Sequence, residues 1–238
     1  SPKKFNLIEL GAGNGEMMRV IIETSKNFSE FSDTCNFQIH EKSIFLKNQQ
    51  QQNLKFENVT WVKDINKSNS HPTIFLANEF FDALPIKQFF KKKNEWFERF
   101  VDLKEIDKAE FKEQIADIKK IENNLNFEIS KNQNIIEYSP VSFKYLKDIC
   151  NIIKKNNGCI LIIDYGYLNS QMHETLQAVN NHEYSNVLKD IGNSDITYNI
   201  NFNLFKRFIN QFDDLNSIIS SQKKFLTSMG IIQRAEII

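Results

Sequence analysis

The segment LIELGAGNGEMM, residues 7–18, constrains the fold of this chain more than any other. The apolar run Phe5–Leu10 leads into three glycines at alternate positions, and apolar residues at helical spacing follow them. A buried strand that enters a tight turn and then a helix is typical of an α/β protein with a parallel sheet. Glu9 falls near the end of this strand, where such sheets bind ligands. The three glycines are Gly11, Gly13 and Gly15.

The rest of the chain alternates predicted strands with predicted helices, which is the pattern of a parallel sheet with helices on both faces. We expect strands at Phe5–Leu10, Phe37–His40, Asn58–Val62, Thr73–Ala77 and Cys159–Asp164. We expect helices at Glu16–Lys26, Ser43–Leu54, Val141–Lys155, Asn203–Phe212 and Ser220–Met229. The sequence therefore predicts a single α/β domain over residues 1–238, which we expect to lack N- and C-terminal flanks.

Two segments interrupt this alternation. Residues 86–131 begin with alternating apolar and polar residues around Lys92–Asn94, which predicts an antiparallel hairpin. From residue 104 they continue as a highly charged stretch with weak periodicity, which we interpret as a surface excursion. Residues 168–200 are polar and irregular, and a connection of this length predicts a functional loop rather than a plain link.

The charge balance limits the partners of this chain. Its 30 basic and 30 acidic side chains give a formal net charge of zero, so no overall field attracts nucleic acid or an anionic membrane. No apolar run approaches the roughly 20 residues that span a bilayer. Three scattered cysteines indicate a reducing compartment, and His173 and His182 are not spaced as metal ligands. We expect no nucleic-acid partner, no membrane insertion and no bound metal.

Two ligands compete for a glycine turn after a first strand. The dinucleotide fingerprint G-x-G-x-x-G needs a third glycine for close helix–strand packing, and here that position is Glu16. A carboxylate at the start of the helix would also repel a pyrophosphate. An acid followed by three alternate glycines favours S-adenosylmethionine (SAM), which carries no phosphate. We expect Glu9 to meet its ammonium group, Glu41 its ribose hydroxyls and Asp64 its adenine amino group.

Six ordered motifs resemble the MidA family of class I SAM-dependent methyltransferases, which occurs in bacteria and mitochondria. The motifs are LIELGAGNGEMM, NEFFDALP, WFERFV, LIIDYGY, TLQAVNNHEY and SDITYNINF, and the segment SQKKFLTSMGI is similar to the family's tail. The resemblance runs from about residue 6 to about residue 234. It implies a Rossmann-like class I methyltransferase fold, SAM as cofactor and a protein as substrate.

The mitochondrial member of that family is an arginine methyltransferase that acts on a core subunit of respiratory complex I during assembly. The resemblance therefore implies protein arginine methylation, in a bacterial cytoplasm or a mitochondrial matrix. Ala12 and Asn14 depart from the family pattern, and family members carry an upstream segment that helps to cover the site. The resemblance assigns the cofactor loop to Glu9, Gly11, Gly13 and Gly15, the ribose acid to Glu41, and the reacting site to Asn78, Glu79 and Asp82.

The residues after the fourth strand suit an arginine acceptor. Glu79 and Asp82 stand three apart, and on a turn or a first helical turn this spacing points both carboxylates the same way. Two carboxylates clamp a planar guanidinium in bidentate fashion, and the amide of Asn78 is placed to orient the clamp. The same two acids also fit a role as caps of the following segment before Pro85.

The residues alone leave two other functions open. An NAD-dependent oxidoreductase shares the fold, and Glu41 would serve its ribose equally well, so Glu16 is what separates the two. A catalytically inactive assembly or binding factor with a methyltransferase fold is the second alternative, against which the acids of the acceptor segment argue. Asp164 and Tyr165 either line the same mouth or pack at the end of the fifth strand. The oligomeric state stays open.

Overall fold

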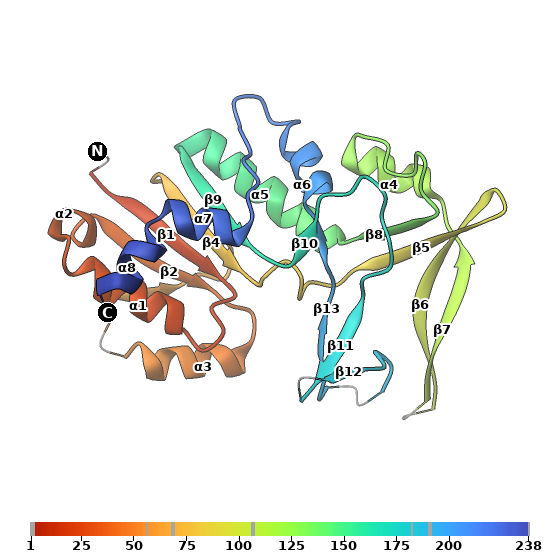
Figure 1. The fold of residues 1–238 in the computed structure, drawn as a ribbon, viewed down its shortest axis with the longest axis horizontal. Coiled ribbons are helices and arrows are strands. Elements are labelled where there is room, and N and C mark those ends of the chain that lie inside the picture. The colour runs from red at the N-terminus through yellow and green to blue at the C-terminus, as the bar shows by residue number, and fades with distance from the viewer. Residues whose placement is uncertain are drawn as a thin grey trace.

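The computed structural model describes residues 3–55, 57–67, 70–105, 108–181, 183–189 and 192–237, so His182 lies outside the described residues. A five-stranded parallel sheet forms one half of the molecule, in the order β3-β2-β1-β4-β9 (Figure 1). Each of the five predicted strands is confirmed. They are β1 (Phe5–Leu10), β2 (Cys35–His40), β3 (Val59–Trp61), β4 (Thr73–Asn78) and β9 (Gly158–Ile163).

The strand order reverses at β1. From β1 the chain runs outward to β2 and β3, and it then returns to place β4 on the other side of β1. Glu9 pairs in register with Ile39 of β2 on one side and with Leu76 of β4 on the other. Open parallel sheets bind ligands beyond the carboxyl ends of their strands at such a switch point. The fold therefore puts the glycine turn after β1 where a ligand is expected.

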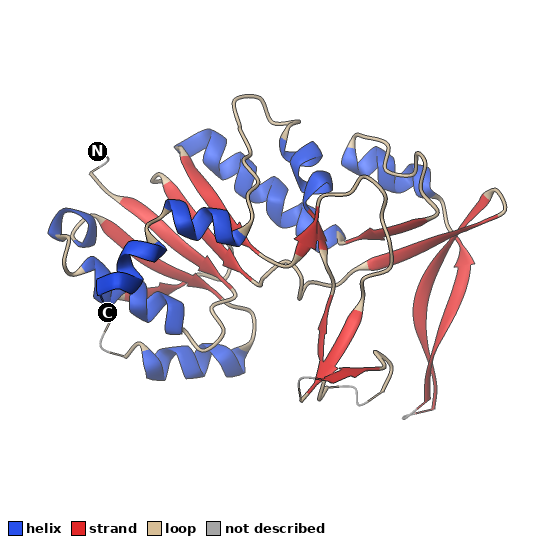
Figure 2. Ribbon diagram, viewed as in Figure 1, coloured by secondary structure: helices blue, strands red, loops and turns tan. Residues whose placement is uncertain are grey.

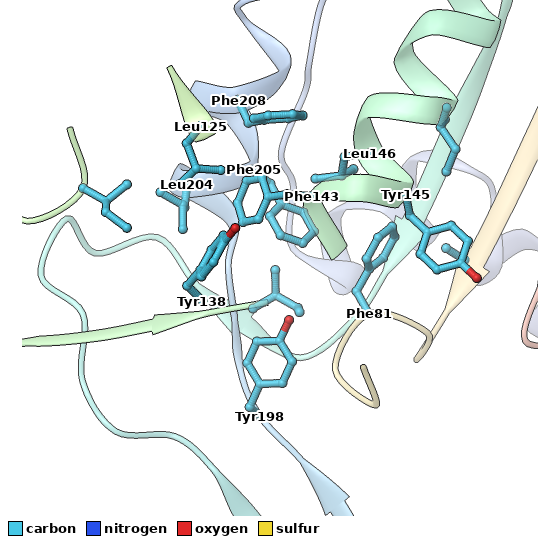
Figure 3. Close-up of a cluster of buried hydrophobic side chains, with 14 of the residues drawn as sticks. Phe81, Leu125, Tyr138, Phe143, Tyr145, Leu146, Tyr198, Leu204, Phe205 and Phe208 are labelled. Carbon is cyan, nitrogen blue, oxygen red and sulfur yellow. The ribbon is translucent and has the colours of Figure 1, made fainter. Parts of the chain in front are cut away.

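Helices flank the five-stranded parallel sheet (Figure 2). They are α1 (Glu16–Ser25), α2 (Ser29–Ser32), α3 (Ile44–Asn53), α5 (Pro140–Asn156), α6 (Phe202–Ile209), α7 (Gln222–Ser228) and α8 (Ile231–Ile237). Successive strand residues point to opposite faces, and the core accordingly divides into two apolar clusters. Leu7 of β1 shares a cluster with Met18 of α1, whereas Ile8 belongs to a larger cluster with Leu146 of α5 and Phe205 of α6 (Figure 3).

A four-stranded antiparallel sheet, in the order β7-β6-β5-β8, forms the other half. Its strands are β5 (Lys87–Lys92), β6 (Glu95–Glu105), β7 (Lys108–Ile115) and β8 (Ile135–Tyr138). β5 and β6 form the predicted hairpin, with Lys92 paired to Glu95. β6 and β7 extend away from the rest of the molecule (Figure 1).

The charged stretch after residue 104, predicted as a surface excursion, forms regular structure, and only its second part packs into the core. β7 extends the antiparallel sheet, and α4 (Ile118–Leu125) follows it. Ile118 and Leu125 are buried, as is Ile129 beyond the helix, and all three join the larger apolar cluster. The apolar residues of α4 lie on its core side, whereas Phe111 and Ile115 of β7 are exposed.

Residues 168–200, predicted to be irregular, contain several short strands, and the prediction that they form a functional loop stays a prediction. β11 lies between β12 and β13 in an antiparallel sheet, and β10 pairs with β14 in parallel. Strands of this length are too short to show a periodic pattern in the sequence. No helix of the described ranges is both long and apolar enough to cross a membrane. The strands are β10 (Gly166–Tyr167), β11 (Gln177–Asn180), β12 (Glu183–Ser185), β13 (Asp195–Thr197) and β14 (Ile200–Asn201).

Candidate cofactor and acceptor site

The glycine turn after β1 presents bare backbone. Gly11 has a φ of +65°, and a Cβ at this position would lie only 2.8 Å from Cδ2 of Phe80, so a larger residue would collide with that ring. Gly13 has a φ of +54°, and a Cβ there would have no atom within 4 Å. The first glycine is needed for packing and for backbone conformation. The second leaves open space beside the chain, as a bound ligand requires.

Glu9 is a buried acid, and among the described residues no cation shifts its pKa. The residue is 3% exposed, and its Oε2 atom has no hydrogen-bond partner among the residues that the structure describes. Burial raises the pKa of Glu9 from 4.5 to about 7, although the backbone N–H of Met18 donates to the carboxylate and works in the opposite direction. A buried carboxylate with an unpaired oxygen is costly. An ammonium group, such as that of SAM, would supply the donor and the charge that this oxygen lacks, so the residue fits that cofactor.

Glu41 follows the last residue of β2, and its carboxylate is held at both oxygens. Oε1 accepts the backbone N–H of Ser43 at 2.8 Å, and Oε2 accepts Nε2 of Gln50 at 3.1 Å. The hydroxyl of Ser43 in turn accepts a hydrogen bond from the N–H of Leu46 and so caps α3. Each carboxylate oxygen keeps a further lone pair. The carboxylate can therefore accept two ribose hydroxyls without losing the bonds that hold it.

Asp64 lies just beyond β3. Its Oδ1 accepts the backbone N–H of Asn66 at 3.0 Å and the side-chain amide of Asn66 at 3.2 Å. The backbone hydrogen bond from Asn66 is the main reason that the pKa of Asp64 is lowered, so this acid is charged at neutral pH. The structure thus puts Glu9, Glu41 and Asp64 at the carboxyl ends of three adjacent strands.

The acceptor segment begins where β4 ends. Asn78 and Glu79 are exposed, and Glu79 has a φ of +46°, a left-handed conformation that costs a non-glycine residue of order 1–3 kcal/mol. Asp82 is 5% exposed, and within the described ranges its Oδ1 has no hydrogen-bond partner. A bend and turns follow β4 instead of a helix, so neither acid is a helix cap. The two acids lie in different environments, one exposed and one buried.

Asp164, at the end of β9, holds this segment in place. Its Oδ2 accepts the backbone N–H groups of Phe81 at 3.1 Å and Asp82 at 3.3 Å. Burial, followed by the nearby charge of Asp82, raises the pKa of Asp164 to about 7. Burial, followed by the charges of Glu79 and Asp195, raises the pKa of Asp82 to about 6. Four acids therefore gather beside the ends of β4 and β9.

Sequence reasoning left Asp164 undecided and missed Asp195. Asp164 follows its strand as Asp64 follows β3, so the same pattern could have found it. Asp195 lies in the three-residue strand β13, which gave no signal. Tyr198, in the short connection after β13, was also missed. Its backbone N–H donates to the carbonyl of Asp82 at 3.2 Å, and its hydroxyl lies 3.3 Å from that of Ser142. Burial raises the pKa of Tyr198 to about 12, so the hydroxyl stays protonated.

Other chemistries find little support among the described residues. No group of three or more His, Cys, Asp or Glu side chains within those ranges is arranged to hold a metal ion. Burial raises the pKa of the Cys35 and Cys150 thiols, which makes both poor nucleophiles. At the start of α1, Glu16 forms an ion pair with Arg19 and puts negative charge where a pyrophosphate would bind.

The sequence profile of a protein family described as "Putative S-adenosyl-L-methionine-dependent methyltransferase" matches residues 1–220. The chain belongs to this family. Membership decides between the two ligands that the glycine turn left open, because the family depends on SAM. It also agrees with the unpaired Glu9 and with the bare backbone at Gly13.

Curated relatives align with nearly the whole of this chain, at low sequence identity. "Protein arginine methyltransferase NDUFAF7, mitochondrial" from Xenopus laevis is 26% identical, over 100% of this chain and 59% of the relative. The human protein of that name is 23% identical, over 98% of this chain and 58% of the relative. The Caenorhabditis elegans homologue is 24% identical, over 97% and 58%. The chain spans about three fifths of the length of these relatives, and the predicted family is confirmed.

Solved structures confirm the predicted class I methyltransferase fold. A protein from Burkholderia thailandensis, solved with S-adenosyl-homocysteine bound, matches with a TM-score of 0.80 at 18% identity. The match covers 99% of this chain and 62% of the other. A native structure from the same organism and superfamily matches with a TM-score of 0.79 at 18% identity, over 99% and 65%.

Proposed function

We propose that this protein is a SAM-dependent protein arginine methyltransferase. Its family and the names of its curated relatives support the proposal, but one feature of the site carries it. Asp82 is buried, one of its oxygens has no hydrogen bond to any described residue, and three further acids lie near it. A guanidinium offers both the positive charge and the planar array of N–H donors that such a cluster lacks.

Each residue of the cofactor side has a separate task in this proposal. SAM supplies an electrophilic methyl group on a sulfonium. Glu9 binds the ammonium group, and Asp64 accepts from the adenine amino group. Glu41 accepts both ribose hydroxyls. The backbone at Gly11, Gly13 and Gly15 leaves room for the amino-acid end of the cofactor.

The acceptor side holds and orients the arginine. Glu79 and Asp82 accept N–H groups of the guanidinium, and Asn78 orients it through its amide. A cation placed among these acids favours their charged forms, so Asp82 and Asp164 ionise at lower pH than in the free protein. Asp82, whose Oδ1 has no other partner, then accepts the proton that the guanidinium loses on methylation. The methyl group of SAM is already activated, so the main contribution of the enzyme to its transfer is to position the acceptor.

The acceptor is a protein in this proposal, as the names of the relatives suggest. The MidA resemblance supports a subunit of respiratory complex I, or a similar protein, as that acceptor. It supports the mitochondrial matrix, or the cytoplasm of a bacterium, as the compartment.

The test uses the full-length protein and the proteins of cells that lack its gene. These proteins are incubated with SAM that carries a tritiated methyl group, and the labelled residues are identified by mass spectrometry. We expect label on arginine side chains. Label on another residue type would overturn the arginine acceptor. A protein that binds S-adenosyl-homocysteine but transfers no label would favour the inactive assembly factor.

A further inference from the structure

Four consecutive glutamines, Gln49–Gln52, lie in α3, and one of them differs from its neighbours. Gln50 has no exposed surface, whereas Gln49, Gln51 and Gln52 are exposed. A buried amide costs free energy unless its polar atoms are hydrogen-bonded. The partners of Gln50 therefore indicate what its burial accomplishes.

Gln50 joins three segments of the cofactor site. Its Nε2 donates to the carbonyl oxygen of Gly13 at 2.9 Å and to Oε2 of Glu41 at 3.1 Å. Its Oε1 accepts the indole N–H of Trp61, the last residue of β3, at 2.9 Å. An indole N–H only donates and a carbonyl oxygen only accepts, so a single orientation of the amide satisfies all three partners.

We propose that Gln50 is a positioning residue for the cofactor, one that fixes the Glu41 carboxylate relative to the glycine turn. The inference rests on the proposed function in one respect, namely that Glu41 binds the ribose. With Ser43 on Oε1 and Gln50 on Oε2, the carboxylate has no freedom to rotate away from the two hydroxyls. The same amide holds the turn at Gly13, so the sugar and the amino-acid end of SAM meet one rigid unit.

Packing adds to these hydrogen bonds. A Cβ at Gly15 would lie 3.5 Å from Cγ of Gln50, so the stem of the side chain lies directly against the turn. One helical turn further along, Nδ2 of Asn53 donates to the carbonyl of Asn14 at 2.9 Å. Side chains of α3 thus hold two successive carbonyls of the turn. The arrangement predicts that Gln50 governs selectivity for the ribose hydroxyls, and not merely the stability of α3.

The test is calorimetry on the full-length protein with two ligands: S-adenosyl-homocysteine and its analogue without the ribose 2′- and 3′-hydroxyls. The wild type is expected to bind the natural ligand at least tenfold more tightly. Gln50→Met keeps the length of the side chain and removes its hydrogen bonds. It is expected to lose about tenfold or more for S-adenosyl-homocysteine and much less for the analogue, because charged hydrogen bonds contribute on this scale. Gln51→Met, at the exposed neighbour, is the matched control and should bind both ligands as the wild type does.

An equal loss for both ligands, or no loss, would overturn the positioning role, because a residue that only stabilises α3 leaves the discrimination unchanged. A wild type that does not bind S-adenosyl-homocysteine would instead refute the proposed function, and one that binds both ligands equally would refute the ribose contact of Glu41. If Gln50→Met does not fold, Gln50→Glu takes its place under the same criteria. That variant keeps the acceptor for Trp61, loses both donors and adds a charge beside Glu41.

Discussion

Replacing Glu9 by glutamine tests whether the buried acid of β1 is kept for a cation. Glu9 is 3% exposed, and burial raises its pKa from 4.5 to about 7. Between these values the folded protein binds more protons than the unfolded chain, so stability falls as the pH rises through this window. The difference amounts to about 3 kcal/mol above pH 7. The free protein therefore carries a destabilised site, as a site reserved for a ligand often is.

Glu9→Gln is neutral at every pH, and we expect it to be more stable than the wild type by up to about 3 kcal/mol at pH 8. At pH 5, where wild-type Glu9 is protonated in the folded state, the advantage should be less than about 1 kcal/mol. Urea unfolding followed by circular dichroism at the two pH values measures both quantities. The same variant should bind S-adenosyl-homocysteine about 1.5–3 kcal/mol more weakly at pH 8, because an amide cannot neutralise the ammonium group.

The control is Glu23→Gln, which removes an exposed acid of the same region on α1. It should change neither the dependence of stability on pH nor the affinity for S-adenosyl-homocysteine. A Glu9→Gln variant with the same pH dependence of stability as the wild type would refute the reasoning about burial. Unchanged affinity at pH 8 would refute the ammonium contact.

Three further predictions concern the acids of the site. Glu79→Gln should abolish methyl transfer and leave S-adenosyl-homocysteine binding nearly intact, because the clamp loses one charge. A radiolabel assay beside calorimetry decides this, and undiminished transfer would rule out the clamp. Glu41→Ala should weaken binding by about 1–3 kcal/mol, and unchanged affinity in calorimetry would remove the ribose assignment. The kcat/KM of methyl transfer should fall as the pH drops below about 7, because protonation of Asp164 and then Asp82 removes the charge that holds a guanidinium. A flat profile from pH 5 to pH 8 would contradict it.

The cofactor side of the site was predictable because its deciding residues lie next to the strands in the chain. An apolar run identifies each strand, and the acid at or just beyond its end identifies the ligand-binding edge. Glu9, Glu41 and Asp64 all follow this rule, and the parallel order of the strands brings them to one edge. Their roles toward SAM stay predictions, because a strand pattern shows where these side chains lie and not which ligand they bind.

Gln50 could not be identified in this way, because α3 reverses the usual relation between polarity and burial. Ile44 and Phe45 of this helix are 78% and 69% exposed, whereas Gln50 is fully buried. A prediction of the buried face of α3 from its apolar residues would therefore place Ile44 and Phe45 in the core and Gln50 at the surface. The burial of Gln50 depends on Gly13 and Trp61, which lie in other segments of the chain.

The acceptor side was only partly predictable. The segment after β4 was found by its acids, and it forms a turn, which was one of the two predicted alternatives, but nothing local indicated the left-handed backbone at Glu79. Asp195 and Tyr198 reach the site from strands or connections too short to show a period. Contacts of this kind arise when segments far apart in the chain pack together, and local patterns carry no information about them.

Binding of SAM, and not of a dinucleotide, across the glycine turn with the ribose at Glu41 is the central claim. Calorimetric titration of the full-length protein with S-adenosyl-homocysteine and with NADH tests it most directly. We predict binding of S-adenosyl-homocysteine that weakens in Glu41→Ala, and no binding of NADH. Binding of NADH together with no binding of S-adenosyl-homocysteine would contradict the claim.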